Sequence, residues 1–246
     1  MGVGSDWLVG GGALVVLLIS AMSVQCAPPS SKRAEEVRKR VGPVLKQELA
    51  GKDLVYGAPV FMRVFKESRE LEVWVEHRDG KFRLFKSYAI AAFSGSLGPK
   101  LAEGDGQAPE GFYHVPAKMM HPTSSYHLAF NLGYPNAYDR AHGRTGSFLM
   151  VHGNRVSIGC YAMTDKRIEE IYTVADAALR NGQKFFRVHC FPFRMSTERL
   201  GKLSKEETKW AAFWANLKGG FDYFEAHRVP PNVTVKEKRY RFSAAE

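Results

Sequence analysis

Residues 149–165 read Leu-Met-Val-His-Gly-Asn-Arg-Val-Ser-Ile-Gly-Cys-Tyr-Ala-Met-Thr-Asp, and the rest of the chain is best understood outward from them. The apolar run at 148–151 predicts a buried strand that ends at His152. A polar turn follows, and then either Thr164 or Asp165 is placed to cap the next helix. His152 and Cys160 are therefore joined by a tight loop that can fold one side chain back beside the other.

A cysteine beside a histidine is the pairing that cysteine-based acyl transfer requires. A free thiol has a pKa of about 8.5, and a neighbouring imidazole can accept its proton. Gly153 and Gly159 flank the two side chains, and the absence of a Cβ lets substrate or backbone come close. Ser157 can orient the imidazole or hydrogen-bond a substrate. The alternative is a structural cysteine near a core histidine, since free cysteine is often simply buried.

Around this stretch the hydrophobic pattern predicts an α+β fold, mostly β, with a few peripheral helices. Apolar periodicity predicts a helix at 165–181 that ends at Gly182. The pair Ser204 and Glu207 predicts a capping box that opens a helix to about residue 217, stopped by Gly219 and Gly220. Strands are expected at 60–65, 71–76, 82–91, 110–115, 126–131 and 184–191.

A polar and aromatic loop at 133–146 precedes the expected strand at 148–151, and a loop in that place can line a cleft. Its Asn136 and Tyr138 are candidate substrate contacts. Arg140 and Arg144, together with Arg155 downstream, are candidates to hold substrate carboxylates through paired hydrogen bonds. The alternative is a solvated turn with surface arginines.

Residues 7–27 are apolar and uncharged, which is typical of an export signal. The segment is also long enough to persist as a membrane anchor. Cys26 suggests a third alternative, a lipoprotein, although Gln25 before it fits that processing site poorly. Residues 34–50 have helical spacing, and Pro43 is expected to divide them into two helices. We expect residues 28–55 to form a helical spacer or docking segment.

The chain has 246 residues, with 35 Lys and Arg against 25 Asp and Glu, so its formal net charge is +10. A basic surface suits nucleic acid, anionic lipid or an acidic polymer. Because no nucleic-acid motif is present, we expect no nucleic-acid partner, and a polyanionic cell wall fits the charge equally well.

Cys160 and Cys190 are the two cysteines left if the N-terminal segment is removed. In an oxidising compartment such a pair is usually a disulfide, and a bridge would abolish the nucleophile. Strand alternation places His189 and Cys190 on opposite faces, so one of them is expected to be buried. A metal site built from His152, Cys160, His189 and Cys190 lacks the CxxC or HExxH spacing, and no metal or cofactor is expected.

Four motifs carry a family resemblance. His152-Gly153 followed by Ser-x-Gly-Cys at 157–160, after Gly-Asp-Gly-Gln-Ala-Pro-Glu-Gly-Phe-Tyr at 104–113, resembles the YkuD-type L,D-transpeptidases of bacterial cell walls. Residues 130–140 and 159–165 resemble the YafK-like branch of Gram-negative bacteria. The similarity runs from about residue 60 to 195. Two positions depart from the pattern: Ile158 replaces a second histidine, and Ala162 stands where many members have an arginine.

The resemblance implies that Cys160 is the nucleophile and His152 the general base of a periplasmic L,D-transpeptidase. Its substrate would be peptidoglycan stem peptides containing meso-diaminopimelate, and Gly159 would contribute to the oxyanion site. A hydrolase of the same bond class, acting as a carboxypeptidase or releasing a wall-attached lipoprotein, is the alternative; a non-catalytic wall-binding protein is the second. The expected layout is a signal or anchor at 1–27, a spacer at 28–55, a catalytic domain at 56–195 and a helical and aromatic extension at 196–246.

Overall fold

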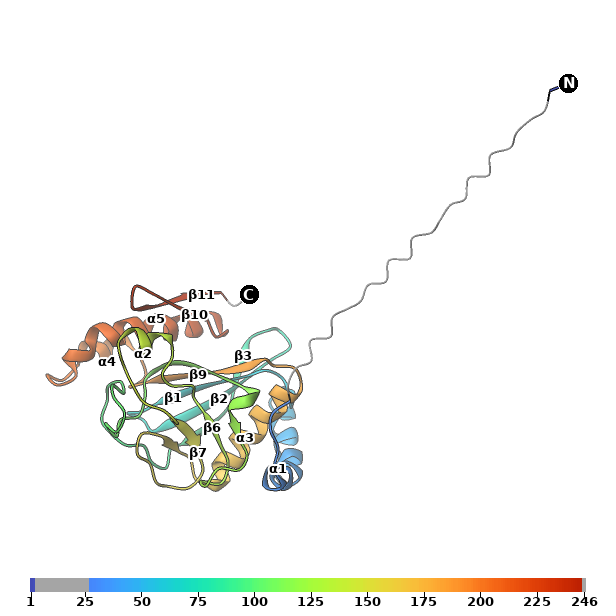
Figure 1. The fold of residues 1–246 in the computed structure, drawn as a ribbon, viewed down its shortest axis with the longest axis horizontal. Coiled ribbons are helices and arrows are strands. Elements are labelled where there is room, and N and C mark those ends of the chain that lie inside the picture. Colours follow the sequence, from blue (N-terminus) through green and yellow to red (C-terminus); the bar gives the residue numbers. More distant parts are fainter. Residues whose placement is uncertain (3–26, 245–246) are drawn as a thin grey trace.

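The computed structural model describes residues 1–2 and 27–244 of the chain, which form three sheets and the helices packed around them (Figure 1). The helices are α1 (Lys32–Ala50), α2 (Ala137–Ala141), α3 (Asp165–Arg180), α4 (Thr197–Gly201) and α5 (Ala211–His227). The strands are β1 (Val60–Phe65), β2 (Glu70–Glu76), β3 (Phe82–Ala89), β4 (Gly111–Pro116), β5 (Met120–His121), β6 (Ala129–Asn131), β7 (Met150–His152), β8 (Tyr161–Ala162), β9 (Phe185–Phe191), β10 (Asn232–Lys236) and β11 (Arg239–Ser243).

The largest sheet has five strands in the order β3-β2-β1-β9-β4. Its central pair, β1 and β9, is parallel, and the other pairs are antiparallel. Every residue of β1 is buried. Full burial follows from cover on both sides, since alternate side chains of a strand point to opposite faces. The strands predicted from the sequence are present, although β3 ends at Ala89 and β6 has only three residues.

The two faces of this sheet support two separate cores. Val60, Met62 and Val64 of β1 belong to the core shared with α1, α3 and the small sheet. Phe61 and Phe65 point the other way and pack with residues of α5. In Figure 1, α5 and the β10-β11 hairpin lie along one side of the five-stranded sheet, while α1, α3 and β7 lie on the other.

The second sheet has four short strands in the order β5-β6-β7-β8 and holds the candidate chemistry. Strands β7 and β8 are parallel, so the chain between them must return before it pairs again. That return is the loop 153–160. Helix α3 begins directly after this region and contacts β6 and β7, and it also contacts β1 and β9 of the large sheet. It therefore fixes the loop to the core of the domain.

Helix α1 differs from the prediction in two respects. It is one continuous helix with Pro43 inside it, not two helices. Pro43 lies on the exposed face, where water can satisfy the carbonyl that loses its partner. In addition, Val37, Val41, Leu45 and Leu49 are buried in the main core against α3. The helix is therefore docked on the domain, and it is not a free spacer.

Helix α5 also corrects a prediction, because it runs through Gly219 and Gly220 and ends at His227. A Cβ at Gly220 would lie 2.5 Å from the Phe112 ring, and one at Gly219 would lie 2.9 Å from the Phe242 ring. These glycines thus permit close packing and do not stop the helix. The bonds of the predicted capping box are present between Ser204 and Glu207, but a 3-10 turn separates them from α5.

The predicted export signal or anchor, including Cys26, lies outside the described residues. Within the described part of the chain, no helix combines the length and the apolar character needed to cross a membrane.

The C-terminal extension folds back on the domain. The side chain of Asn216 in α5 donates a hydrogen bond to the backbone carbonyl of Tyr240 in β11 and accepts one from its N–H.

Candidate active site

His152 and Cys160 are brought to one face of the small sheet. His152 is the last residue of β7, and Cys160 directly precedes β8. The register pairs Val151 with Tyr161, and both side chains are fully buried in the core. Because side chains alternate along a strand, His152 and Cys160 share the opposite face. The sequence-based expectation that the loop folds these two residues toward each other is consistent with this register.

His152 is held in a defined orientation. Its Nδ1 lies 2.6 Å from the carbonyl oxygen of Gly153. A carbonyl only accepts hydrogen bonds, so Nδ1 carries the proton and Nε2 presents a lone pair. The ring of Tyr126 lies against the imidazole with centroids 4.7 Å apart. Burial lowers the pKa of His152 below its ordinary value, and the Gly153 carbonyl opposes this in part. The imidazole is therefore neutral at pH 7 and able to act as a base.

Cys160 is partly exposed and carries a free thiol. Its Sγ accepts a hydrogen bond from Met150 N–H at 3.4 Å and donates one to the carbonyl of Phe148 at 3.6 Å. Burial raises the pKa of the thiol above its ordinary value, while Met150 N–H and the Lys100 ammonium act in the opposite direction. The resting thiol is thus protonated, and it needs a base to become a nucleophile.

The loop 153–160 is fixed by contacts at both ends. Asp165 of α3 accepts Asn154 N–H at 2.7 Å, which ties the turn after His152 to the helix. Gly153 is enclosed, since a Cβ there would lie 2.6 Å from Asp165 Oδ1 and 2.7 Å from the Tyr126 carbonyl. Gly159 has a φ of +111°, which favours glycine, and its α-carbon faces the backbone of Gln107. Both glycines therefore have a steric role in shaping the loop.

The prediction that Ser157 orients the imidazole is corrected. Its hydroxyl donates to the backbone carbonyl of Cys160 at 2.7 Å. The side chain therefore braces the loop that presents the thiol, and it does not hydrogen-bond the imidazole. Thr164 is the N-terminal cap residue of α3 as expected, but its side chain makes no capping hydrogen bond.

Two large apolar side chains near Cys160 in the sequence are exposed, and the sequence analysis did not single them out as functional. Ile158 is 88% exposed and Phe148 is 73% exposed. Phe148 was expected to begin a buried strand, yet it has a φ of +53° and lies before β7. Tyr126 and Lys100 were also missed as neighbours of the site. They come from distant segments, and only the tertiary fold places them there.

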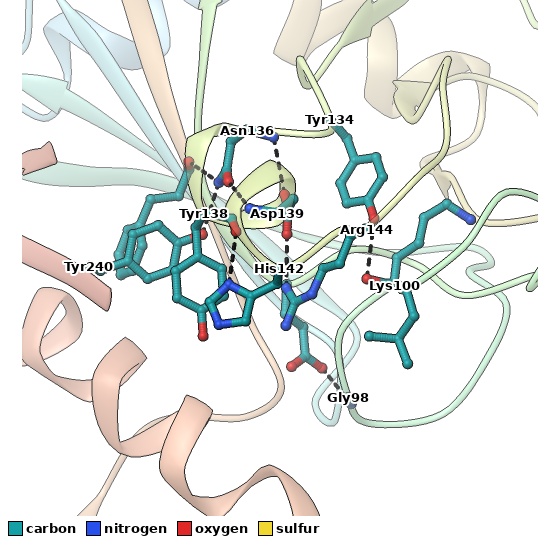
Figure 2. Close-up of polar contacts among 12 residues, drawn as sticks. Gly98, Lys100, Tyr134, Asn136, Tyr138, Asp139, His142, Arg144 and Tyr240 are labelled. Atoms are coloured by element: carbon teal, nitrogen blue, oxygen red, sulfur yellow. Dashed lines mark hydrogen bonds and ion pairs between the residues drawn. The ribbon is translucent and has the colours of Figure 1, made fainter. Parts of the chain in front are cut away.

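Three of the predicted substrate contacts have structural partners instead (Figure 2). Asn136 caps α2 and also donates to Phe112 O and the Tyr240 hydroxyl. Tyr138 is buried and stacks on Tyr240 with ring centroids 4.3 Å apart. Arg144 is buried in an ion pair with Asp139 at 2.8 Å. These side chains hold α2 against the C-terminal hairpin, so the prediction that they bind substrate is corrected.

Arg140 and Arg155 are exposed. Arg140 donates to the Pro135 carbonyl beside α2. Arg155 lies in the loop between His152 and Cys160 and borders a surface hollow with Asn154, Thr164, Asp165, Lys166 and Arg167. Of the predicted arginines, Arg155 is the one that belongs to the loop joining His152 to Cys160.

Cys190 and His189 are both buried, because β9 is covered on both faces. We expected one of the two to be buried, and the structure buries both. Cys160 and Cys190 are both free, with no bridge between them. Burial raises the pKa of the Cys190 thiol well above its ordinary value, so this cysteine is inert. Among the described residues, no group of His, Cys, Asp or Glu is arranged to hold a metal ion.

Comparison with known proteins shows the family to which the chain belongs. The profile of the YkuD family, described as an L,D-transpeptidase catalytic domain, matches residues 63–188. The chain is 42% identical over 227 residues to the protein named "Putative L,D-transpeptidase YafK" of Escherichia coli K12, covering 92% of this chain and 87% of the relative. The same values hold for its counterpart in Escherichia coli O157:H7.

This chain belongs to the YkuD family of L,D-transpeptidases. Among solved structures it is similar to a K307A mutant of the helical cell shape determining protein Pgp2 from Campylobacter jejuni, with 23% identity and a TM-score of 0.45 over 77% of this chain and 64% of that one. Pgp2 without that mutation gives 18% identity and a TM-score of 0.43, over 78% and 80% of the two chains. The predicted α+β fold of the YkuD family is confirmed.

Proposed function

We propose that this protein is a cysteine-dependent L,D-transpeptidase that acts in the periplasm on peptidoglycan stem peptides containing meso-diaminopimelate. The observation that carries the proposal is the placement of Cys160, a half-buried thiol on the same sheet face as His152, whose Nε2 is free to accept a proton. Membership of the YkuD family supplies the reaction class.

In the proposed reaction, His152 Nε2 removes the thiol proton while Cys160 Sγ attacks an amide carbonyl that follows an L-centre of the stem. In this proposal the N–H groups of Gly159 and Cys160 would stabilise the oxyanion, and such donors contribute about 3 kcal/mol each in known sites. His152 then returns the proton to the leaving amine, and a thioester remains on Cys160. An acceptor amine attacks the thioester, a new amide forms, and the proton returns to the thiol.

Substrate carboxylates need a cation near the site, and Ala162 is buried where many family members carry an arginine. Arg155 and Lys166 border the hollow that opens beside the loop 153–160. We assign the carboxylate contact to this pair, with Arg155 as the bidentate partner. The exposed side chains of Phe148 and Ile158 provide apolar contacts for the stem on the thiol side.

Water in place of the amine would make the same site a hydrolase that trims stems or releases a wall-attached lipoprotein. The test is to incubate the full protein with sacculi that carry bound lipoprotein, and to read muropeptides and released protein by mass spectrometry. Cys160→Ala is the inactive variant, and Cys190→Ala is the matched control that should keep activity.

New cross-links or newly attached protein that disappear in Cys160→Ala would support the transpeptidase. Released lipoprotein or trimmed stems that disappear in the same variant would instead make water the acceptor. Unchanged products in Cys160→Ala would overturn the role of this thiol, and wall binding without any product would favour a binding protein.

A further inference from the structure

A second cavity lies apart from the candidate active site. It has a volume of about 290 Å³ and opens between the edge of the five-stranded sheet, α2 and the C-terminal hairpin. Figure 1 shows this hairpin on the opposite side of the large sheet from β7. No residue of the loop 153–160 lines the cavity. The polar lining residues are His114, Asn136, Arg187, His189 and Asn232, and the apolar walls include Phe112, Phe185, Val233 and Val235.

His189 is the first sign that the cavity is built for a ligand. Its side chain is 1% exposed, and both ring nitrogens lack a hydrogen-bond partner among the described residues. Burial lowers the pKa of His189 well below its ordinary value, and Arg187 and Arg63 lower it further, so the ring is neutral. A neutral imidazole offers one donor and one acceptor, and native proteins rarely leave both unused in the interior.

Arg187 is the second sign. It lies two positions before His189 on β9, so both side chains are on the face that lines the cavity. The guanidinium packs over the Phe185 ring at 5.1 Å, but it has no carboxylate partner among the described residues. Asn136 is already saturated by its own contacts, whereas the Asn232 side chain makes no hydrogen bond in the described part of the chain.

The signs of the charges restrict the ligand. Arg187 is the one cation among the lining residues that is charged at every pH, and burial together with Arg187 lowers the pKa of His114. One positive charge suits a monoanion such as a carboxylate better than a phosphate dianion. No acidic side chain lines the cavity, so a free ammonium group would find no partner there. The amino group of the ligand is therefore blocked, as in a peptide bond.

We propose that this cavity binds the carboxyl end of a short peptide, with the carboxylate on Arg187 and the preceding amide on His189. The guanidinium would hold both carboxylate oxygens, and the unprotonated nitrogen of His189 would accept the amide N–H. The side chains of the last residues would pack on Phe112, Val233 and Val235. This inference does not depend on the chemistry at Cys160.

The test measures binding by calorimetry to the full protein carrying Cys160→Ala, so that turnover plays no part. The probes are N-acetyl-D-alanyl-D-alanine, its L,L isomer, and the C-terminal amide of each. We expect at least one acid to bind saturably and its amide to bind about tenfold more weakly, which corresponds to about 1.4 kcal/mol. A preference for the D,D acid would point to wall stems, and a preference for the L,L acid to polypeptide ends. No saturable binding of either acid would overturn the proposal.

Two variants assign the binding to this cavity. Arg187→Gln should weaken the binding of the acid by about tenfold or more, because the substitution removes a charged hydrogen-bond donor. Arg241→Gln is the matched control, since this exposed arginine lies on the hairpin outside the cavity. His189→Phe should fold with unchanged or raised thermal stability, because it removes two unpartnered polar atoms, and it should lose the ligand. Equal binding in wild-type and Arg187→Gln protein, or full binding in His189→Phe, would overturn the proposal.

Discussion

His152 Nδ1 and the carbonyl oxygen of Gly153 lie 2.6 Å apart, and this contact between neighbouring residues fixes the direction of proton transfer at the site. The carbonyl accepts a hydrogen bond from Nδ1–H, so only Nε2 can act as the base. The thiol and the imidazole are both neutral at rest, because burial raises the pKa of Cys160 and lowers that of His152. The pair therefore works through proton transfer during attack, and not as a preformed ion pair.

The first prediction concerns the acid limb of the pH profile. His152 must be neutral to act, and burial lowers its pKa below the ordinary 6.5. Activity should therefore persist at pH 6.5 and fall only as the pH drops through the lowered pKa. The measurement is kcat/KM against pH, compared with NMR titration of His152 in Cys160→Ala. An acid limb centred above 6.5, or a His152 titration above 6.5, would contradict this assignment.

The second prediction separates the two cysteines by reactivity. The Cys160 thiol is partly exposed, whereas Cys190 is fully buried in β9. Iodoacetamide should label Cys160 in the folded protein, with a rate that keeps rising above pH 9 because the thiol pKa is raised. Cys190 should be labelled only after denaturation. Mass spectrometry of the labelled peptides distinguishes the two cysteines. Labelling of Cys190 in the folded protein, or a disulfide between Cys160 and Cys190, would contradict the prediction.

The sequence was informative where a pattern is local. The strand 60–65 follows from its β-rich composition, and the helix that begins at Asp165 follows from hydrophobic periodicity. The position of His152 and Cys160 at the two ends of one loop follows from the short segment between two strands. Tertiary contacts decided the rest. Gly219 and Gly220 were predicted to end the helix, but the helix continues through them because the Phe112 and Phe242 rings pack against them. Arg144 was predicted to contact substrate, but its ion pair with Asp139 and its packing over the Phe213 ring make it a packing residue.

The third prediction concerns the crowded glycine after His152. Gly153→Ala would place a Cβ 2.6 Å from Asp165 Oδ1 and 2.7 Å from the Tyr126 carbonyl. Because backbone cannot move away cheaply, we expect a loss of about 1–3 kcal/mol in the free energy of unfolding and a large loss of activity. Gly201→Ala is the matched control, since nothing lies within 4 Å of its Cβ. The measurement is the free energy of unfolding of the two variants in urea, and equal values would show that the turn is not crowded.

The last prediction concerns the buried ion pair that anchors the segment leading into β4. Glu110 lies 3.1 Å from Lys66 Nζ, with both side chains fully buried, and it also accepts Trp214 Nε1–H and Gly98 N–H. Burial lowers the pKa of Lys66, and the charge of Glu110 and its hydrogen bond oppose this in part.

Glu110→Ala would remove the carboxylate paired with the Lys66 ammonium, which would keep only the carbonyls of Gly98 and Ser96. It would also leave Trp214 Nε1–H and Gly98 N–H without this acceptor, so we expect the free energy of unfolding to fall by about 3–5 kcal/mol. The control is Glu198→Ala, which breaks an exposed pair with Lys202 and should leave the urea midpoint unchanged. Since exposed pairs are screened by salt and buried ones are not, the effect of Glu110→Ala should also persist at high ionic strength. A loss in Glu110→Ala no larger than in the control would mean that the burial of this pair has no energetic consequence.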